Sequence, residues 1–265
     1  MSIACAPRLV LTALPGLPIV KPGDDLVDLI AAGLLRAQIE LEDSDVIVVT
    51  SKLVSRAEGR FADLGAIEPS ARALEIAALA QKEPRLVELV LRESESISRV
   101  SPGVLVVRHR LGITVAGAGI DLSNVLPSDE AKALDMALLL PVSPDESAAK
   151  IRKGLMDRAK GANTNIGVVI TDSHGRPFRL GTVGAAIGIA GMPALWDQRG
   201  NQDLFGRTLQ ITVTALGDQI AAAADLVAGQ AAEGRPVVHV RGLSFAPADG
   251  RASDLVRPQA QDVYA

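Results

Sequence analysis

The sequence predicts a protein of the α+β class, in which helices and strands are mixed along the chain. Short apolar runs rich in β-branched residues, such as residues 45–49 and 166–170, have the length of buried strands. Between such runs, apolar residues recur at helical spacing, as in residues 27–35. No repeat and no linker divides residues 1–265, so we expect a single module and leave open whether it forms two lobes.

The start and stop signals of the chain place each element. Asp24 and Asp25 precede the first helical pattern, Pro lies near the first turn of the next two helices, and Gly229 follows the last one. Strict alternation marks a half-buried strand at residues 209–215. We predict strands at residues 9–14, 45–49, 104–108, 113–116, 166–170, 209–215 and 237–241, and helices at residues 27–35, 69–81, 84–94, 145–159 and 217–228. Residues 128–139 are expected to form a surface excursion, residues 192–207 an irregular loop, and residues beyond 246 a loosely ordered end.

Composition limits the classes of protein that remain. Hydrophobic residues make up 48 % of the 265 residues but aromatic residues only 2 %, so aliphatic side chains must build the core. The formal net charge of −4 argues against a nucleic-acid partner. The single cysteine, Cys5, allows neither an intramolecular disulfide nor a cysteine zinc site. With no signal-peptide pattern and no apolar run long enough for a bilayer, we expect a cytoplasmic protein without a membrane partner.

Polar residues are densest directly after the predicted strand at residues 166–170. Thr171, Asp172 and Ser173 open a predicted loop there, which suits a binding site because the strand fixes the backbone. An ordinary turn, with Asp and Ser bonding to the backbone, is the alternative. The frequent glycines that follow indicate backbone packed closely against another element or a ligand. These glycines are Gly181, Gly184, Gly188 and Gly191.

Two further segments carry similar chemistry. Ser51, Lys52 and Arg56 follow the strand at residues 45–49 and suit either a phosphate seat at a helix start or an N-cap followed by an exposed basic turn. Residues 116–125 bring small residues together with Asp121 and neutral oxygen donors. Carboxylates flanked by hydroxyl and amide oxygens favour Mg²⁺ or Mn²⁺ over zinc. The phosphate-loop, dinucleotide-binding and nucleophile-elbow motifs are absent, so residue chemistry alone indicates only a metal–phosphate enzyme.

Five segments, taken in order, resemble the F420-0:gamma-glutamyl ligase family over residues 16–242. They read VVTSKLVSRAEGR, AGAGIDLSNV, VVITDSHGRPFRLGTVGAAIGIAG, DLFGRTLQITVTALGDQIAAAADLVAGQ and VVHVRG. The resemblance implies mixed, largely antiparallel sheets in a family-specific fold and an intertwined homodimer. It also implies that GTP activates the terminal carboxylate of the deazaflavin precursor coenzyme F420-0 as an acyl phosphate, that L-glutamate then attacks, and that further γ-glutamyl additions can follow. Two divalent cations, Mg²⁺ or Mn²⁺, and K⁺ are the implied cofactors.

The resemblance also implies which residues bind. Asp121 and Asp172 match ligands of the first metal, and Ser173 and Gln230 match ligands of the second. The positions matching contacts of GTP are Leu17, Pro18, Ile19, Val20, Ser51, Lys52, Arg56, Asn124, Ala228, Gly229, Gln230, Ala231, Ala232, Glu233, Gly234 and Arg235. Arg56 stands where Lys is expected. The positive charge is kept, but a compact ammonium group is replaced by a planar guanidinium group with several fixed donors. No catalytic residue is assigned, and residues 127–137, an apparent insertion, receive no role.

Other readings remain open at this point. A metal-dependent phosphohydrolase would use the same aspartates but release phosphate from GTP without an acceptor. A non-catalytic nucleotide-binding protein, or a ligase of the same family acting on a modified precursor or another amino acid, also fits. Arg176, Arg179 and Arg207 form our hypothetical anion-binding set for the precursor or the incoming glutamate. Some members carry a C-terminal reductase-like domain, which we do not expect in this chain.

Overall fold

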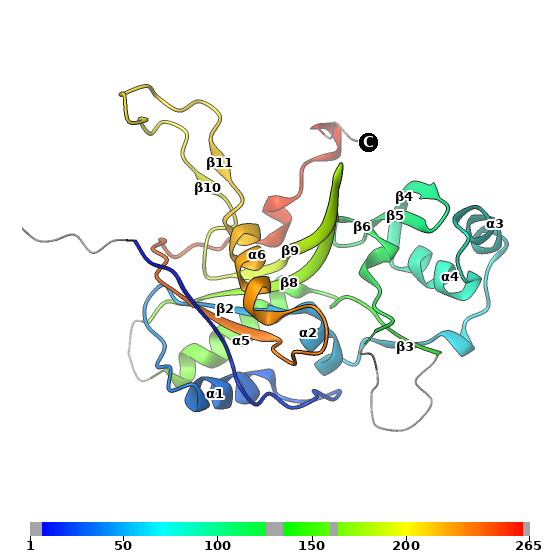
Figure 1. The fold of residues 1–265 in the computed structure, drawn as a ribbon, viewed down its shortest axis with the longest axis horizontal. Helices are drawn as coiled ribbons and strands as arrows, with labels where there is room; N and C mark the ends of the chain where they lie inside the picture. The colour runs from blue at the N-terminus through cyan, green and yellow to red at the C-terminus, as the bar shows by residue number, and fades with distance from the viewer. Residues whose placement is uncertain (1–6, 124, 126–134, 160–163, 262–265) are drawn as a thin grey trace, which may run out of the picture.

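A five-stranded mixed sheet forms the centre of the computed structural model, which describes residues 7–123, 125, 135–159 and 164–261 (Figure 1). Only the pair in the middle of the sheet, β2 with β8, is parallel; the other neighbours are antiparallel. The predicted mixed, largely antiparallel architecture is therefore confirmed. In spatial order the strands are β1 (Val10–Ala13), β12 (Val237–Arg241), β2 (Val46–Thr50), β8 (Gly167–Arg176) and β9 (Arg179–Ala190).

Helices cover both faces of this sheet. On one face, α1 (Leu26–Arg36), α2 (Ser51–Ala57) and α5 (Pro144–Arg158) pack on one set of alternate strand residues. On the other face, α6 (Leu216–Ala228) packs on the residues between them. Because both faces are covered, β2 is a continuous run of buried apolar residues rather than an alternating one.

A smaller lobe lies beside the central sheet, at the right of Figure 1. It packs two helices on a three-stranded sheet around its own apolar cluster. A separate pair, β3 (Phe61–Asp63) with β7 (Met136–Leu138), connects it to the main body. The elements of the lobe are α3 (Ala71–Ala80), α4 (Pro84–Arg92), β4 (Ser94–Ser101), β5 (Val104–His109) and β6 (Thr114–Ala116).

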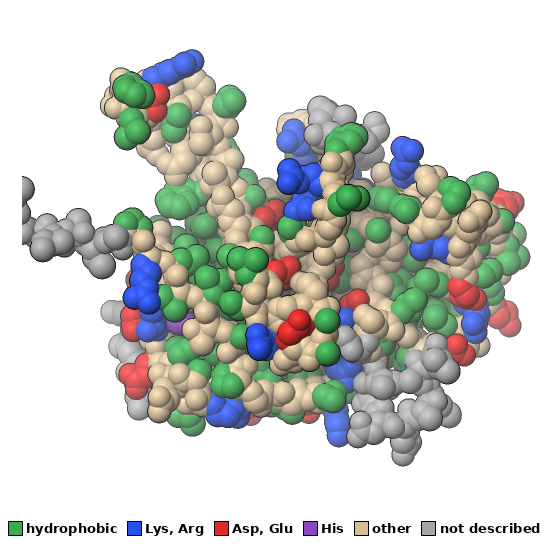
Figure 2. Space-filling view, viewed as in Figure 1, with side chains coloured by type: hydrophobic (Ala, Val, Ile, Leu, Met, Phe, Trp, Pro, Cys, Tyr) green, Lys and Arg blue, Asp and Glu red, His purple; other side chains and the backbone are tan. Residues whose placement is uncertain are grey.

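Two hairpins project from the main body (Figure 1). One is the far end of β8 and β9; the other is a long arm between β10 (Trp196–Asp197) and β11 (Val213–Thr214). Figure 2 shows hydrophobic side chains near the ends of both. Leu180 is 99 % exposed and Leu204 is 98 % exposed, so neither contributes to the core of this chain.

Most predicted helices and strands are confirmed, but β4 and β9 lie outside the predicted strands, and further segments differ. The predicted loop at residues 171–176 continues β8, because β9 pairs with it along its whole length. The strand predicted at residues 209–215 shrinks to β11, since Ile211 and its neighbours lie on the arm without a core to cover. Within the predicted excursion at residues 128–139, β7 is ordered and buried. In the predicted loose end, Ala252 is buried in a short 3-10 helix (Ala252–Leu255).

The predicted close approach at the glycines of residues 181–191 is confirmed at Gly184, Gly188 and Gly191; a Cβ at Gly191 would lie 2.6 Å from the carbonyl oxygen of Ile166 and against Arg152 of α5. A Cβ at Gly184 would lie 2.5 Å from the carbonyl oxygen of Ala221 in α6. A Cβ at Gly188 would lie 2.6 Å from the carbonyl oxygen of Pro144 in α5. The absence of a side chain at Gly184 and Gly188 lets a helix pack directly on the backbone of β9.

Replacing Gly188 with alanine should therefore lower the free energy of unfolding by about 1–3 kcal/mol, because the Pro144 backbone must move. Thermal or denaturant unfolding measures the change. Gly175→Ala is the matched control, since its Cβ would meet nothing within 4 Å. Equal stability of the two variants would contradict the packing argument.

A buried ionic cluster lies at the end of the sheet where β2 begins and β12 ends. Asp45 is 1 % exposed and accepts hydrogen bonds from Arg241 Nε at 2.9 Å and Nη2 at 2.7 Å. The Nε2 atom of His239 lies 2.9 Å from Asp45 Oδ2. Burial alone would raise the pKa of Asp45, but the hydrogen bonds from Arg241 and His239 lower it to about 2.

Because the pKa of Asp45 is lower in the folded protein than the ordinary 3.8, the ionised carboxylate stabilises the fold above that pH. We expect about 2 kcal/mol of stability to be lost as pH falls from roughly 4 to roughly 2. Denaturant unfolding at a series of pH values should show this loss in the wild type and not in Asp45→Asn. The exposed Asp157→Asn serves as control; a wild-type-like pH profile in Asp45→Asn would contradict the assignment.

Within the described residues, no helix combines the length and the apolar character needed to cross a bilayer.

Candidate functional site

The candidate site lies where the parallel strands β2 and β8 leave the core. Their register pairs Thr50 with Thr171, so the first turn of α2 starts beside Asp172. The hydroxyl of Ser51 donates a 2.8 Å hydrogen bond to Asp172 Oδ1. Thr50, not Ser51, is the N-cap residue of α2. Ser51 therefore uses its side chain to hold the aspartate rather than the helix.

Asp121 reaches the same place from the loop after β6. Its backbone exchanges two 2.9 Å hydrogen bonds with Leu138, which fix its position. Lys52 Nζ lies 3.4 Å from Asp121 Oδ2 and donates to the carbonyl oxygen of Ser123 at 3.2 Å. Burial raises the pKa of Asp121, the charge of Lys52 lowers it, and the charge of Asp172 raises it further. The two predicted metal-ligand aspartates thus share one electrostatic environment.

Ser173 and Gln230, the residues predicted to bind a second metal, also meet. The Ser173 hydroxyl lies 2.5 Å from Gln230 Oε1, although the two residues are 57 positions apart. Gln230 follows α6, so this pair lies on the α6 face of β8, whereas Asp172 faces α2. One strand therefore presents oxygen atoms on both of its faces.

Asp225 of α6 is a neighbour that the sequence reasoning missed. Burial raises its pKa, a hydrogen bond from the backbone N–H of Gly184 lowers it, and the charge of Asp172 raises it. The available signal was its position five residues before Gln230, at the end of the same predicted helix. A third carboxylate thus lies within electrostatic range of Asp172.

The N-terminal segment predicted to contact GTP is attached to α2. Arg56 Nε donates a 2.8 Å hydrogen bond to the carbonyl oxygen of Val20, and its guanidinium lies 5.5 Å from the Phe61 ring centroid. Arg56 is 6 % exposed, so the alternative of an exposed basic turn is wrong at this residue. Burial lowers the pKa of Arg56. Before Val20, Leu17 is half-buried while Pro18 and Ile19 are exposed.

The loop predicted to bind GTP at residues 228–235 begins at the end of α6. Gly229 ends the helix with a φ of 77°, and Glu233 accepts a 2.8 Å hydrogen bond from the backbone of Ala231. The loop rejoins the sheet where the backbone N–H of Thr50 donates to Pro236 at 2.9 Å. It therefore returns beside Ser51 and Lys52. From Gln230 to Arg235 its residues are exposed, among them Ala232 and Gly234, while Ala228 is buried.

One histidine, His174, contacts Asp172, and a second, His109, lies within its electrostatic range, although sequence reasoning gave them no role. His174 Nε2 lies 3.1 Å from Asp172 Oδ2. His109 is buried, its Nδ1 accepts from the backbone of Leu111 at 3.0 Å, and burial lowers its pKa while the charge of Glu93 raises it. The signal for His174 was its spacing of two from Asp172, which in a strand places both side chains on one face.

Several predicted positions are not brought to the carboxylates. Arg176 Nη2 donates to the backbone of Leu180 at 3.3 Å, inside the β8–β9 hairpin. Arg207 lies on the β10–β11 arm, where its backbone bonds to Asp203. Among the described residues, no contact joins either arginine or Arg179 to Asp121 or Asp172. Asn124 and most of residues 127–137 lie outside the described residues.

The donor set suits hard divalent cations. Asp121, Asp172, Ser173 and Gln230 offer carboxylate, hydroxyl and amide oxygens, which Mg²⁺ and Mn²⁺ prefer. In the part of the chain that the structure describes, no group of three or more His, Cys, Asp or Glu is arranged as a metal site. Thr171 adds a buried hydroxyl that has no hydrogen-bond partner among the described residues. The side chains thus fit a cation whose coordination is completed by substrate oxygens or water.

The fold and the site define an α+β protein with an acidic, oxygen-rich site at the edge of a mixed sheet. Comparison with known proteins gives the family: the model described as F420-0:Gamma-glutamyl ligase matches residues 16–242. The chain belongs to this family of ligases.

Relatives of this chain cover nearly its whole length. It is 44 % identical over 251 residues to a protein from Methanopyrus kandleri named coenzyme F420:L-glutamate ligase, covering 92 % of this chain and 93 % of the relative. A protein of the same name from Methanothermobacter thermautotrophicus is 43 % identical over 256 residues, with 96 % and 98 % covered. A third, from Natronomonas pharaonis, is 42 % identical over 256 residues, with 94 % and 92 % covered.

Replacing Lys52 with methionine should raise the pKa of Asp121 above its wild-type value, because the ammonium group favours the ionised carboxylate. NMR titration of the aspartate carboxyl carbons, on protein freed of divalent cations, measures the shift. Lys150→Met, at an exposed position of α5, is the control. An unchanged pKa of Asp121 in Lys52→Met would contradict the ion pair between Lys52 and Asp121.

Proposed function

We propose that this protein is a GTP-dependent ligase that joins L-glutamate to the terminal carboxylate of the deazaflavin precursor coenzyme F420-0. The name of its relatives supports the substrates, and further γ-glutamyl additions belong to the same proposal. The observation that carries it is the contact of Ser51 with Asp172 and of Lys52 with Asp121 at one sheet edge. Ser51 and Lys52 are adjacent in the first turn of α2, and each contacts one of the two aspartates.

The reaction proceeds in two balanced steps. A carboxylate oxygen of the precursor attacks the γ-phosphorus of GTP, the bond between that phosphorus and the β–γ bridging oxygen breaks, and GDP leaves. The amine of glutamate then attacks the acyl carbon, the carbon–oxygen bond to phosphate breaks, and inorganic phosphate leaves. The nitrogen releases a proton as the amide forms. Activation is necessary because a carboxylate is a poor electrophile.

The residues of the chain have distinct parts in this proposal. Lys52 and the first turn of α2 offset phosphate charge, because a helix N-terminus and an ammonium group both attract anions. The loop at residues 228–235, which is exposed from Gln230 to Arg235, borders the same edge and supports nucleotide binding there. Asp121 and Asp172 would hold one divalent cation, and Ser173 and Gln230 a second. Bound Mg²⁺ or Mn²⁺ would neutralise charge on the transferring phosphoryl group, with K⁺ as an additional cation.

A homodimer is part of the proposal. Exposed apolar residues concentrate on the two hairpins, where a protomer alone leaves them in water. Monomeric proteins rarely leave such patches uncovered. The residues that support an interface are Phe178, Leu180, Leu204, Phe205 and Ile211.

Mass spectrometry of a reaction containing GTP, L-glutamate, coenzyme F420-0 and Mg²⁺ or Mn²⁺ tests the function. We expect a product heavier than the precursor by one or more glutamyl units. Asp172→Asn should lower the rate of its formation by about a hundredfold or more, because a charge in the phosphate site is lost. The control, Asp157→Asn, changes an exposed aspartate of α5.

Release of phosphate from GTP without precursor or glutamate, and without a glutamyl product, would identify a phosphohydrolase instead. Binding of GTP without either reaction would identify a nucleotide-binding protein. Either result overturns the proposed ligase.

A further inference from the structure

A cavity of about 250 Å³ lies beside the candidate site and has His174, a neighbour of Asp172, in its lining. Strands of the main body and of the smaller lobe form two of its walls, through His174 and Thr114. The segment after the last strand forms another wall, with Leu255, Val256 and Arg257. In Figure 1 this segment, drawn in red, runs alongside β9.

Contact with the candidate site comes through His174. This histidine lines the cavity, and its Nε2 atom lies 3.1 Å from Asp172 Oδ2. Ala185, which also lines the cavity, pairs with Asp172 across the strands β8 and β9. A molecule in the cavity would therefore have one end next to the proposed phosphoryl-transfer centre.

The volume of the cavity suits the smallest of the three proposed substrates. Pockets for drug-sized ligands enclose roughly 300–1,000 Å³, and a nucleoside triphosphate or a deazaflavin is at least of that size. An amino acid fits within about 250 Å³. The short side chains of Ala185, Ala186 and Ala252 leave this space open.

The charges on the walls match an amino acid with two carboxylates. Arg108 and Arg257 line the cavity from opposite elements, β5 and the C-terminal segment. Arg108 Nε lies 3.2 Å from Glu95 Oε2, which orients the guanidinium. Within the described residues, Arg257 makes no hydrogen bond or ion pair, so its five donors face no protein acceptor. Guanidinium groups bind carboxylates through two parallel hydrogen bonds.

A carboxylate on the cavity wall suits the ammonium group of the same amino acid. Asp218, in the first turn of α6, accepts a 2.9 Å hydrogen bond from the backbone of Ala186 through Oδ1. This bond fixes the carboxylate at the cavity wall, where it favours an ammonium group. Ala185, the neighbour of Ala186 in β9, pairs with Asp172 across the strands, so an amine bound at this wall lies toward the proposed phosphoryl-transfer centre.

The geometry points to this cavity as the binding site for L-glutamate, with Arg257 and Arg108 binding its carboxylates. The inference rests on the proposed ligase function and adds a residue outside the family match, since that match ends at residue 242. It assigns the C-terminal segment to substrate binding, whereas the sequence predicted a loosely ordered end there.

Steady-state kinetics with varied L-glutamate tests the assignment. In Arg257→Ala the apparent KM for glutamate should rise about tenfold or more, because a charge-assisted hydrogen bond is lost. The KM values for GTP and for the precursor should stay at their wild-type values. Arg257→Lys should recover part of the loss, since it keeps the charge and loses the fork. Arg108→Ala should act in the same direction.

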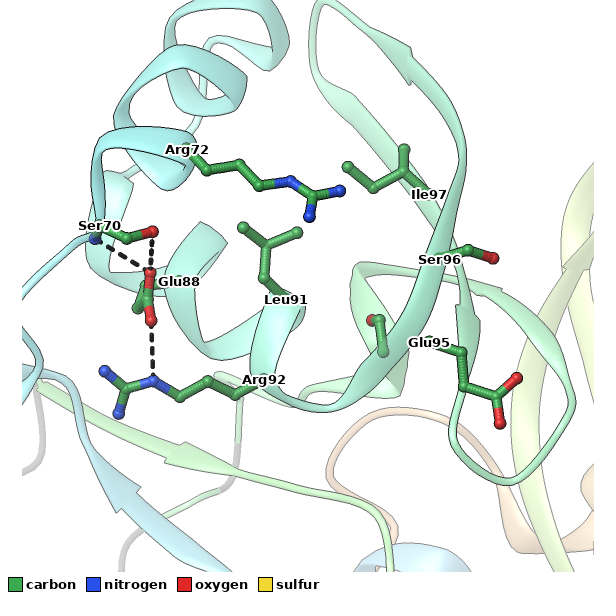
Figure 3. A pocket seen from close by; sticks show the side chains of 9 residues that line it. Ser70, Arg72, Glu88, Leu91, Arg92, Glu95, Ser96 and Ile97 are labelled. Carbon is green, nitrogen blue, oxygen red and sulfur yellow. Dashed lines mark hydrogen bonds and ion pairs between the residues drawn. The ribbon is translucent and has the colours of Figure 1, made fainter.

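The matched control is Arg72→Ala, which removes an arginine from a different cavity. That cavity, of about 230 Å³, lies in the smaller lobe between α3, α4 and β4 (Figure 3). Arg72 extends across it toward Ile97, while Glu88 is already bound by Ser70 and Arg92. We expect wild-type kinetics for all three substrates in Arg72→Ala.

The outcomes separate this inference from the function on which it rests. A wild-type glutamate KM in both Arg257→Ala and Arg108→Ala, with product still formed, overturns the glutamate site and leaves the ligase intact. A rise in the KM for the precursor alone overturns it as well. If the wild type forms no glutamyl product, the ligase proposal fails, and calorimetry of L-glutamate binding to wild type and Arg257→Ala decides the cavity separately. Weaker binding in Arg257→Ala then supports the site, and equal or undetectable binding overturns it.

Discussion

The parallel pairing of β2 with β8 determines where the polar residues of this protein meet. Parallel strands end at the same edge of a sheet, so the chain leaving β2 at Thr50 emerges next to Thr171. Ser51 and Asp172 follow directly and bond to each other. Because β12 runs antiparallel to β2, the loop that precedes β12 ends at the same edge. The site therefore follows from the register of the sheet.

The carboxylates at this edge of the sheet favour the binding of a positive charge. Burial raises the pKa of both Asp121 and Asp225, and the charge of Asp172 adds to each. Lys52 offsets part of this repulsion for Asp121. Like carboxylates in a partly buried site favour a bound cation, because a cation relieves both the repulsion and the loss of hydration.

The sequence could predict the elements whose local signals agree with their packing. Asp25 caps α1 and Gly229 ends α6, as their positions predicted. The prediction that Asp121 and Asp172 lie close together came from family resemblance, because no local pattern encodes proximity between residues so far apart in the sequence. The extension of β8 beyond Ile170 was missed because a Thr-Asp-Ser-His run has weak strand character. The alternation around Ile211 predicted a half-buried strand, but the arm provides no core for its apolar face.

The strand β8 connects parts of the molecule that would otherwise be independent. Ile170 belongs to the core on one face of the sheet, and Val169 belongs to the core on the other. Further along, Asp172 and His174 face α2 and the cavity, whereas Ser173 faces the end of α6. Alternation of side chains along one extended backbone thus gives the two proposed cation positions and the proposed amino-acid site a common support. Tight packing of α5 and α6 on the neighbouring glycines of β9 holds that support in place, so the distance between these sites is set by the core of the protein.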